Sequence, residues 1–211
     1  MTPKREAKFR AVVKRRQPNL TIILENVHDF HNIGAVLRTC DCVGIKEIFV
    51  LYSDPGLDKD HLTIGSRTSS GARKWVDIHF YTSVKTCFEH VQSKYEKIYS
   101  THLAEDAVSL YELDLSESVA LLFGNERDGV TDEALAYSNG NFIIPQAGMV
   151  QSLNISVACA VTLYEAYRQR AHKGMYTDNV PLSEAEQSDL YDVYKSRHDN
   201  REKRRTTWKT E

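Results

Sequence analysis

One arginine, Arg38, lies among small and apolar residues in the stretch NIGAVLRTC, which covers residues 32–40. The pattern is typical of a helix that continues past this stretch, because at 100° per residue the apolar side chains share one face. They are Ile33, Val36, Leu37, Cys40 and Val43. Arg38 falls on the other side with Gly34 and Asp41, and Asn32 is expected to cap the helix. Its guanidinium could bind a ligand on this open face, or it could pair with Asp41 three residues later. Helical spacing alone leaves both interpretations open.

A second candidate for chemistry is the carboxylate of Glu126 in the stretch GNERDG, residues 124–129. The flanking glycines, Gly124 and Gly129, would let backbone groups approach a ligand closely, although they are equally typical of a turn. The spacing matches neither the G-x-G-x-x-G fingerprint of dinucleotide-binding folds nor a P-loop. His28 and His31 could form a metal pair, but no third ligand accompanies them, and we expect no metal site.

The third candidate is the stretch PQAGMVQSLN, residues 145–154, which joins an apolar run directly to a long helical pattern. Its Ser152 has the residue type of a helix N-cap. Asn154 is unusual in a first helical turn, because asparagine favours caps over helix interiors. Neither residue by itself indicates a particular reaction.

Strand and helix patterns alternate along the chain and predict the scaffold of these segments. Six short β-rich runs are expected to be strands, at residues 20–27, 47–52, 75–81, 97–103, 119–124 and 141–145. Helices are expected at residues 33–43, 84–95, 132–138, 152–170 and 183–194. This alternation predicts an α/β fold with a mainly parallel sheet and helices on both faces. The three segments follow the first, fifth and sixth strands, so we expect them at the carboxyl edge of the sheet, where ligands bind.

The net charge of −2 conceals two basic ends. Residues 1–20 carry seven Lys and Arg against one Glu, and residues 195–211 carry seven against three acidic residues, which leaves −12 on the remainder. Basic arms on an acidic body favour a polyanionic partner such as nucleic acid, although charged ends also keep a chain solvated.

The sequence also predicts the cellular compartment of the protein. It has no signal-peptide pattern and no apolar run near the ~20 residues that span a bilayer, so we expect a cytoplasmic protein with no membrane partner. Its four cysteines lack the spacing of zinc or C-x-x-C redox sites, which predicts reduced structural thiols.

Three motifs taken together are more specific than any one of them. NIGAVLRTCDCVG (32–44), LLFGNERDG (121–129) and IIPQAGMVQSLNISVA (143–158) occur in an order and spacing that closely resembles the SpoU/TrmH family of the SPOUT methyltransferases. The similarity runs from about residue 20 to residue 176. It implies an α/β SPOUT domain at 20–176 whose C-terminal chain forms a trefoil knot, a rare exception among folds. We expect a basic RNA-binding helix at 1–19 before it, and a helical extension with a basic tail at 177–211 after it.

The resemblance also implies a cofactor, partners and site residues. The expected cofactor is S-adenosylmethionine, held mostly through backbone groups of Thr101, Gly124, Ile144 and Leu153. Arg38 would be the catalytic arginine, in a site shaped by Asn32, Glu126, Ser152 and Asn154. RNA would be bound by the basic arms and the end of the last core helix, for which we name Arg10, Arg15, Arg16, Arg168 and Arg170. The implied partners are tRNA and a second copy of the chain, and no DNA partner is expected.

The implied activity is methyl transfer to the ribose 2′-OH of a tRNA guanosine, with guanosine 18 of the D-loop as the expected nucleotide. Two alternatives remain, namely the same reaction on rRNA or the tRNA anticodon loop, and a non-catalytic RNA-binding or assembly protein with this fold. A guanidinium is a poor general base, because its pKa lies above ~12 and it has no free lone pair. We therefore expect Arg38 to bind the adjacent RNA phosphate and to stabilise the developing alkoxide.

Overall fold

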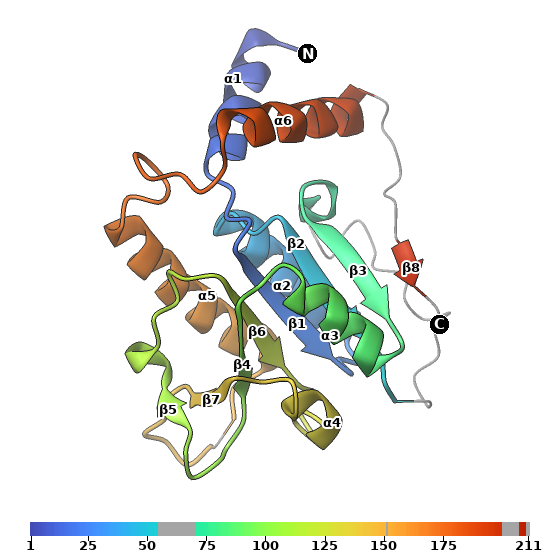
Figure 1. Ribbon diagram of the computed structural model, residues 1–211, viewed down its shortest axis with the longest axis vertical. Helices are drawn as coiled ribbons and strands as arrows, with labels where there is room; N and C mark the ends of the chain where they lie inside the picture. The colour runs from blue at the N-terminus through green and yellow to red at the C-terminus, as the bar shows by residue number, and fades with distance from the viewer. Residues whose placement is uncertain (55–70, 151, 200–206, 210–211) are drawn as a thin grey trace.

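A parallel β-sheet forms the centre of the computed structural model, which describes residues 1–54, 71–150, 152–199 and 207–209 (Figure 1). Its strands lie in the order β5-β7-β4-β6-β1-β2-β3-β8. In the described part of the chain they are β1 Leu20–Glu25, β2 Glu47–Leu51, β3 Asp77–Tyr81, β4 Lys97–Thr101, β5 Val108–Ser109, β6 Val119–Phe123, β7 Gly140–Ile143 and β8 Thr207–Lys209. The six predicted strands and their parallel pairing are confirmed. The short edge strands β5 and β8 are additional.

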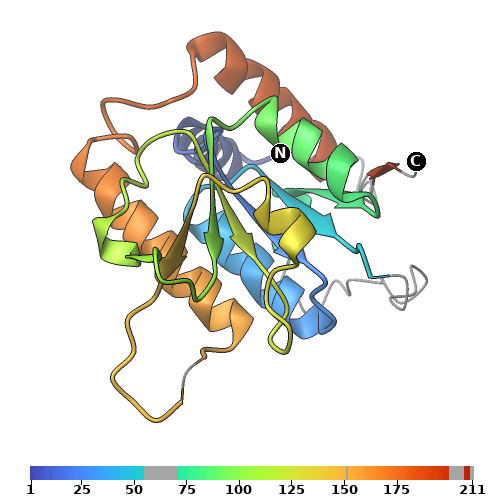
Figure 2. The ribbon, with the colours of Figure 1, turned by 60° about the horizontal axis from the view of Figure 1, so that its bottom comes forward.

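Helices cover both faces of the sheet, as predicted. They are α1 Pro3–Lys14, α2 Phe30–Cys42, α3 Val84–Gln92, α4 Asp132–Leu135, α5 Ile155–His172 and α6 Glu184–Asp199, with short 3₁₀ turns η2 Ala72–Lys74 and η3 Leu110–Glu112. Helices α2 and α5 pack side by side on one face, and α3 and α4 lie on the other (Figures 1 and 2).

The caps of the two helices nearest the predicted site differ from our expectation. Helix α2 begins after Asp29, whose carboxylate accepts a hydrogen bond from the amide of His31 at 2.7 Å. Asn32 therefore lies in the first turn, and its predicted capping role is wrong. Helix α5 begins after Asn154, not at Ser152, and the Asn154 side chain accepts from the amide of Ser156 at 2.9 Å. The capping preference of asparagine thus explains a position that had seemed anomalous inside a helix.

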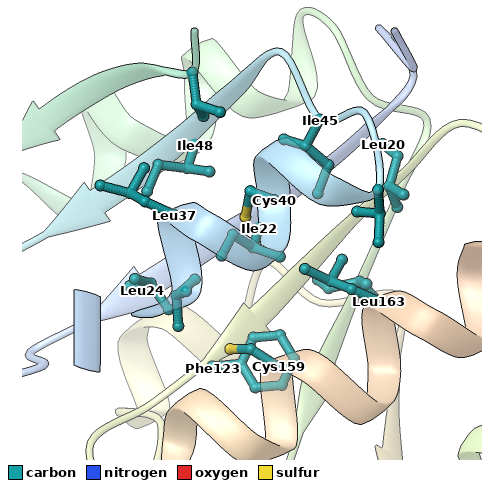
Figure 3. Packing of buried hydrophobic residues seen from close by; sticks show 14 of the residues in the cluster. Leu20, Ile22, Leu24, Leu37, Cys40, Ile45, Ile48, Phe123, Cys159 and Leu163 are labelled. Carbon is teal, nitrogen blue, oxygen red and sulfur yellow. The ribbon is translucent and has the colours of Figure 1, made fainter. Parts of the chain in front are cut away.

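The core has one layer on each face of the sheet. Side chains of β1 alternate between these layers, because Ile22 and Leu24 pack toward α2 and α5 (Figure 3), whereas Ile23 packs toward α3. Burying each such aliphatic side chain contributes about 1.5–3 kcal/mol. The cysteines Cys40, Cys87 and Cys159 are buried and all four are free, as predicted; burial raises the pKa of these three thiols and keeps them protonated.

The two ends of the chain meet in a third cluster. Phe9 and Val13 of α1 pack against Leu190 and Tyr194 of α6, and the ring of Trp75 lies 5.2 Å from that of Phe9. The basic N-terminal helix is thus braced by the C-terminal extension, although the proposed domain boundaries stay a prediction. Residues 200–206, 210 and 211 of the basic tail lie outside the described residues. The C-terminal knot also stays a prediction. None of the described helices combines the length and apolar character required to cross a membrane.

Candidate functional site

A cavity of about 400 Å³ opens at the carboxyl edge of the sheet, where the adjacent strands β7, β4 and β6 end. The four positions expected to hold a cofactor all line it, namely Thr101, Gly124, Ile144 and Leu153. Buried apolar side chains also line it, from Phe123, Phe142 and Ile155. Figure 2 shows the segment that follows β7, residues 144–150, extending away from the sheet beside this edge. The structure therefore brings the second and third sequence motifs, together with the end of β4, around one cavity with an apolar interior and a loop-rich rim.

The loop that carries Glu126 is a self-supporting turn. A Cβ on Gly124 would lie 2.0 Å from the carbonyl oxygen of Gly129, so no other residue fits without moving the loop. Asn125 and Gly129 exchange backbone hydrogen bonds of 3.2 and 3.1 Å. The Asn125 side chain closes the turn, because its Oδ1 accepts from the amides two and three residues later at 2.8 and 2.6 Å. The turn interpretation of the glycines is confirmed, and the turn lines the cavity; close backbone contact with a ligand stays a prediction.

Asn125 was missed as a site residue in the sequence analysis. The sequence signal that could have identified it is that of an Asx turn, namely an asparagine followed by polar residues and a glycine. That glycine, Gly129, adopts a positive φ of 72° in the structure. The turn leaves the side chain of Glu126 exposed at the rim of the cavity.

Three of the expected site residues form a hydrogen-bonded chain across the rim. The Nδ2 of Asn32 donates to Oε1 of Glu126 at 2.7 Å, and the Nδ2 of Asn154 donates to Oδ1 of Asn32 at 3.1 Å. Asn32 thus bridges the first turn of α2 to the two loops that line the cavity. Ser152 lines the cavity as well, at the end of the segment leading into α5.

Arg38 is exposed on α2 and makes no hydrogen bond or ion pair with any part of the chain that the structure describes. The alternative pairing with Asp41 is wrong, because Asp41 Oδ1 accepts from Nη2 of Arg16 at 2.5 Å. Gly34 is buried, so the open face expected beside Arg38 does not include it. Arg38 is also absent from the described residues that line the cavity. Its guanidinium is therefore free to bind a group from outside this chain.

The five arginines named for RNA divide into exposed and buried groups. Arg10, Arg15 and Arg168 are exposed, although Arg10 contacts Glu6 at 2.9 Å and Arg168 contacts Glu165 at 2.8 Å. Arg16 and Arg170 are fully buried, and the expectation that they face RNA is wrong.

Each buried guanidinium is engaged inside the protein. Arg16 binds the carboxylate of Asp41 and the carbonyl of Ile45. Arg170 donates to five acceptors between 2.6 and 3.2 Å, which belong to Gln17, Asn19, Leu115 and Glu117. Burial lowers the pKa of Arg170 to about 10, which still leaves it charged at neutral pH. These two side chains stabilise the start of β1 and the end of α2. All five N–H donors of Arg170 are used within the protein, so none is free to bind a phosphate.

Known proteins resemble this chain in sequence and in fold. The model of the SpoU rRNA methylase family matches residues 19–164. A tRNA (guanosine(18)-2′-O)-methyltransferase of Escherichia coli K12 is 40% identical over 191 residues, which cover 90% of this chain and 81% of the relative.

Two solved structures are also similar. The Aquifex aeolicus TrmH/SpoU tRNA-modifying enzyme has a TM-score of 0.81 and 34% identity, and the match covers 93% of this chain and 97% of that one. An AdoMet-bound rRNA methyltransferase of Sinorhizobium meliloti has a TM-score of 0.62 and 28% identity, with coverage of 76% and 60%. The family match includes all three motifs and the cavity that the second and third of them line. The chain therefore belongs to the SpoU rRNA methylase family.

Proposed function

We propose that this protein transfers a methyl group from S-adenosylmethionine to the ribose 2′-OH of guanosine 18 in the D-loop of tRNA. The observation that carries the proposal is the cavity at the ends of β4, β6 and β7, with the chain from Glu126 through Asn32 to Asn154 on its rim. The substrate is suggested by the E. coli relative, which is named for guanosine 18 and resembles nine tenths of this chain.

The cavity suits S-adenosylmethionine in size and chemistry. Its volume of about 400 Å³ falls within the range of ligand sites for cofactor-sized molecules, and its wall combines buried apolar side chains with loop backbone. The absence of a Cβ at Gly124 lets two loop segments approach closely beside that wall. Thr101, Gly124, Ile144 and Leu153 would hold the cofactor. When bound, it would supply a methyl group made electrophilic by the neighbouring sulfonium.

The protein side chains would then orient the ribose and stabilise charge. Asn32 fixes the Glu126 carboxylate through a 2.7 Å hydrogen bond, and Ser152 and Asn154 approach from the opposite loop. Arg38 would bind the phosphate next to the target ribose, since its guanidinium has no competing partner in the described residues. The same charge would stabilise the alkoxide that develops as the 2′-OH loses its proton.

We further propose that the enzyme is a homodimer. Helix α5 presents an apolar stripe with Val157, Tyr164 and Tyr167 exposed by 47%, 53% and 39%. A second copy would cover this stripe next to α2, which carries Arg38. Tyr164→Asp is expected to shift the mass measured by light scattering from dimer to monomer; a wild-type monomer would contradict this part of the proposal.

RNA contact is proposed for the exposed arginines alone. Arg10 and Arg15 extend the basic surface of α1, which α6 braces, and Arg168 lies on α5. Each phosphate that these side chains neutralise would make tRNA affinity fall with rising salt.

Substitution of Arg38 tests the proposed catalytic role. Arg38→Ala is expected to abolish methyl transfer to tRNA while leaving the affinity for S-adenosylhomocysteine, measured by calorimetry, within about twofold of wild type. Arg38→Lys retains the charge but loses the planar fork, so it separates the two contributions. Normal turnover by Arg38→Ala would refute the role of this residue. Failure of the wild-type protein to bind S-adenosylhomocysteine would instead favour a non-catalytic RNA-binding protein.

A further inference from the structure

The most deeply buried carboxylate near the site belongs to Glu25, the last residue of β1. Its side chain has no exposed surface, and no ion pair with it occurs in the described residues. Three donors satisfy its oxygens instead, at 3.0 Å from the amide of Thr131, 2.6 Å from the Thr131 hydroxyl and 3.3 Å from the Ser53 hydroxyl. A buried carboxylate without a cation is costly to maintain unless such hydrogen bonds compensate it.

Thr131 gives this carboxylate a direct link to the cavity. It is the N-cap of α4, where its Oγ1 accepts from the amide of Ala134 at 3.3 Å while donating to Glu25. It also follows the loop of residues 124–130, whose entrance is fixed by the close approach of Gly124 to Gly129. The Glu25–Thr131 contact therefore fixes the exit of the loop that presents Glu126.

On its C-terminal side, Glu25 is followed by the segment that carries the rim residue Asn32. The chain continues through Asn26 into α2, which carries Asn32. Asn26 adopts a positive φ of 51°, and its Oδ1 accepts from the amides of Ser53 and Asp54 at 3.0 and 3.2 Å. Glu25 and its neighbour thus tie the ends of β1 and β2 to the loop after β6. Asn32 follows β1 and Glu126 follows β6, so the contact joins the two strand ends from which these residues approach one another.

We propose that Glu25 is a positioning residue for the reaction, which holds the 124–130 loop so that Glu126 meets Asn32 at the rim of the cavity. The effect on turnover rests on the proposed function, whereas the effect on the loop does not. Removing the carboxylate frees the exit of the loop and lets Glu126 move. A displacement near 1 Å in a catalytic arrangement costs on the order of a hundredfold in rate.

The test compares Glu25→Ala, Glu25→Gln and Thr131→Val with two matched controls. Glu47→Gln alters another buried carboxylate, which lies at the opposite end of the neighbouring strand β2. Ser83→Ala removes the capping hydroxyl of α3, just as Thr131→Val removes that of α4. Hydrogen exchange is followed at the amide of Gly129, which bonds within the loop and not to Glu25. The kcat and KM for tRNA are measured on the same proteins.

Glu25→Ala and Thr131→Val are expected to speed exchange at Gly129 at least tenfold and to lower kcat about 10- to 100-fold. Glu25→Gln should stay within a few-fold of wild type, because its amide oxygen still accepts from the Thr131 amide. The controls should lower the melting temperature but leave both loop exchange and kcat unchanged.

Two results would overturn the proposal. One is a hydrogen-exchange rate at the Gly129 amide of Glu25→Ala that equals the wild-type rate; Thr131→Val is used instead if the alanine variant does not fold. The other is equal acceleration in the controls, which would mean that Glu25 contributes only general stability. A wild-type protein without methyltransferase activity would refute the proposed function, while the exchange comparison would still decide the role of Glu25.

Discussion

Replacing Arg170 by methionine tests the assignment of this arginine to the interior. The variant keeps the apolar stem but removes all five hydrogen bonds of the guanidinium. Three of the abandoned acceptors are backbone carbonyls, in Asn19, Leu115 and Glu117; that of Asn19 still accepts from a strand amide at 3.0 Å, so the other two lose their donor. Each buried acceptor left unpaired costs about 1–3 kcal/mol, and partial relaxation brings the expected total to about 3–5 kcal/mol. That is a large share of the 5–15 kcal/mol that typically stabilises a domain.

The assay is equilibrium unfolding in urea, with Arg168→Met as the matched control two residues earlier on the same helix. Arg168 is exposed by 69% and pairs with Glu165, so its loss should cost less than about 1 kcal/mol. The control should instead weaken tRNA binding, which the Arg170 variant should affect only through stability. A loss below 1 kcal/mol for Arg170→Met, or an equal loss for Arg168→Met, would refute the reasoning.

Two further predictions concern the loop and a buried charge. Gly124→Ala should weaken S-adenosylhomocysteine binding at least tenfold in calorimetry, since its Cβ would lie 2.0 Å from backbone, whereas Gly148→Ala meets nothing within 4 Å and should bind normally. Burial opposes ionisation of Glu47, but hydrogen bonds from His79 and Lys94 prevail and lower its pKa from 4.5 to about 2. The unfolded state therefore binds more protons between these values, so about 3 kcal/mol of stability present above pH 4.5 should disappear as the pH falls toward 2. Urea titrations should show the advantage of wild type over Glu47→Gln shrinking across that window, and a constant difference would contradict the assignment.

Local patterns predicted the main elements of the fold because their causes are local. Apolar β-rich runs predicted β1, β2, β3, β4, β6 and β7, and their alternation with helices implies parallel pairing. Strands β5 and β8 escaped prediction because segments of two and three residues carry no period. The first turn of α2 was assigned too late, because Asp29 and Asn32 are both suitable caps and only the folded chain selects between them.

Charged side chains limited the prediction of the site. Arg16 and Arg170 belong to basic segments, and nothing in those segments indicates that carbonyls and amides 25 to 153 residues away would surround them. The opposite holds for Arg38, because Asp41, the alternative partner considered for it, is bound by Arg16. Glu25 gave no signal either, because one carboxylate at the end of an apolar strand is typical of a solvated strand end. Its role depends on Thr131, which is 106 residues away.

The second and third motifs line one cavity, the first motif meets its rim through the Asn32–Glu126 hydrogen bond, and the comparisons place the chain in the SpoU rRNA methylase family. The proposed function specifies both the target nucleotide and the atom that is methylated. It is tested most directly by incubating the full chain with labelled S-adenosylmethionine and an unmodified tRNA transcript, followed by mapping of the modified nucleotide. We expect one 2′-O-methylguanosine at position 18 of the tRNA, and none when Arg38→Ala replaces wild type. Methylation at another nucleotide, on a base instead of the ribose, or only on rRNA would contradict it.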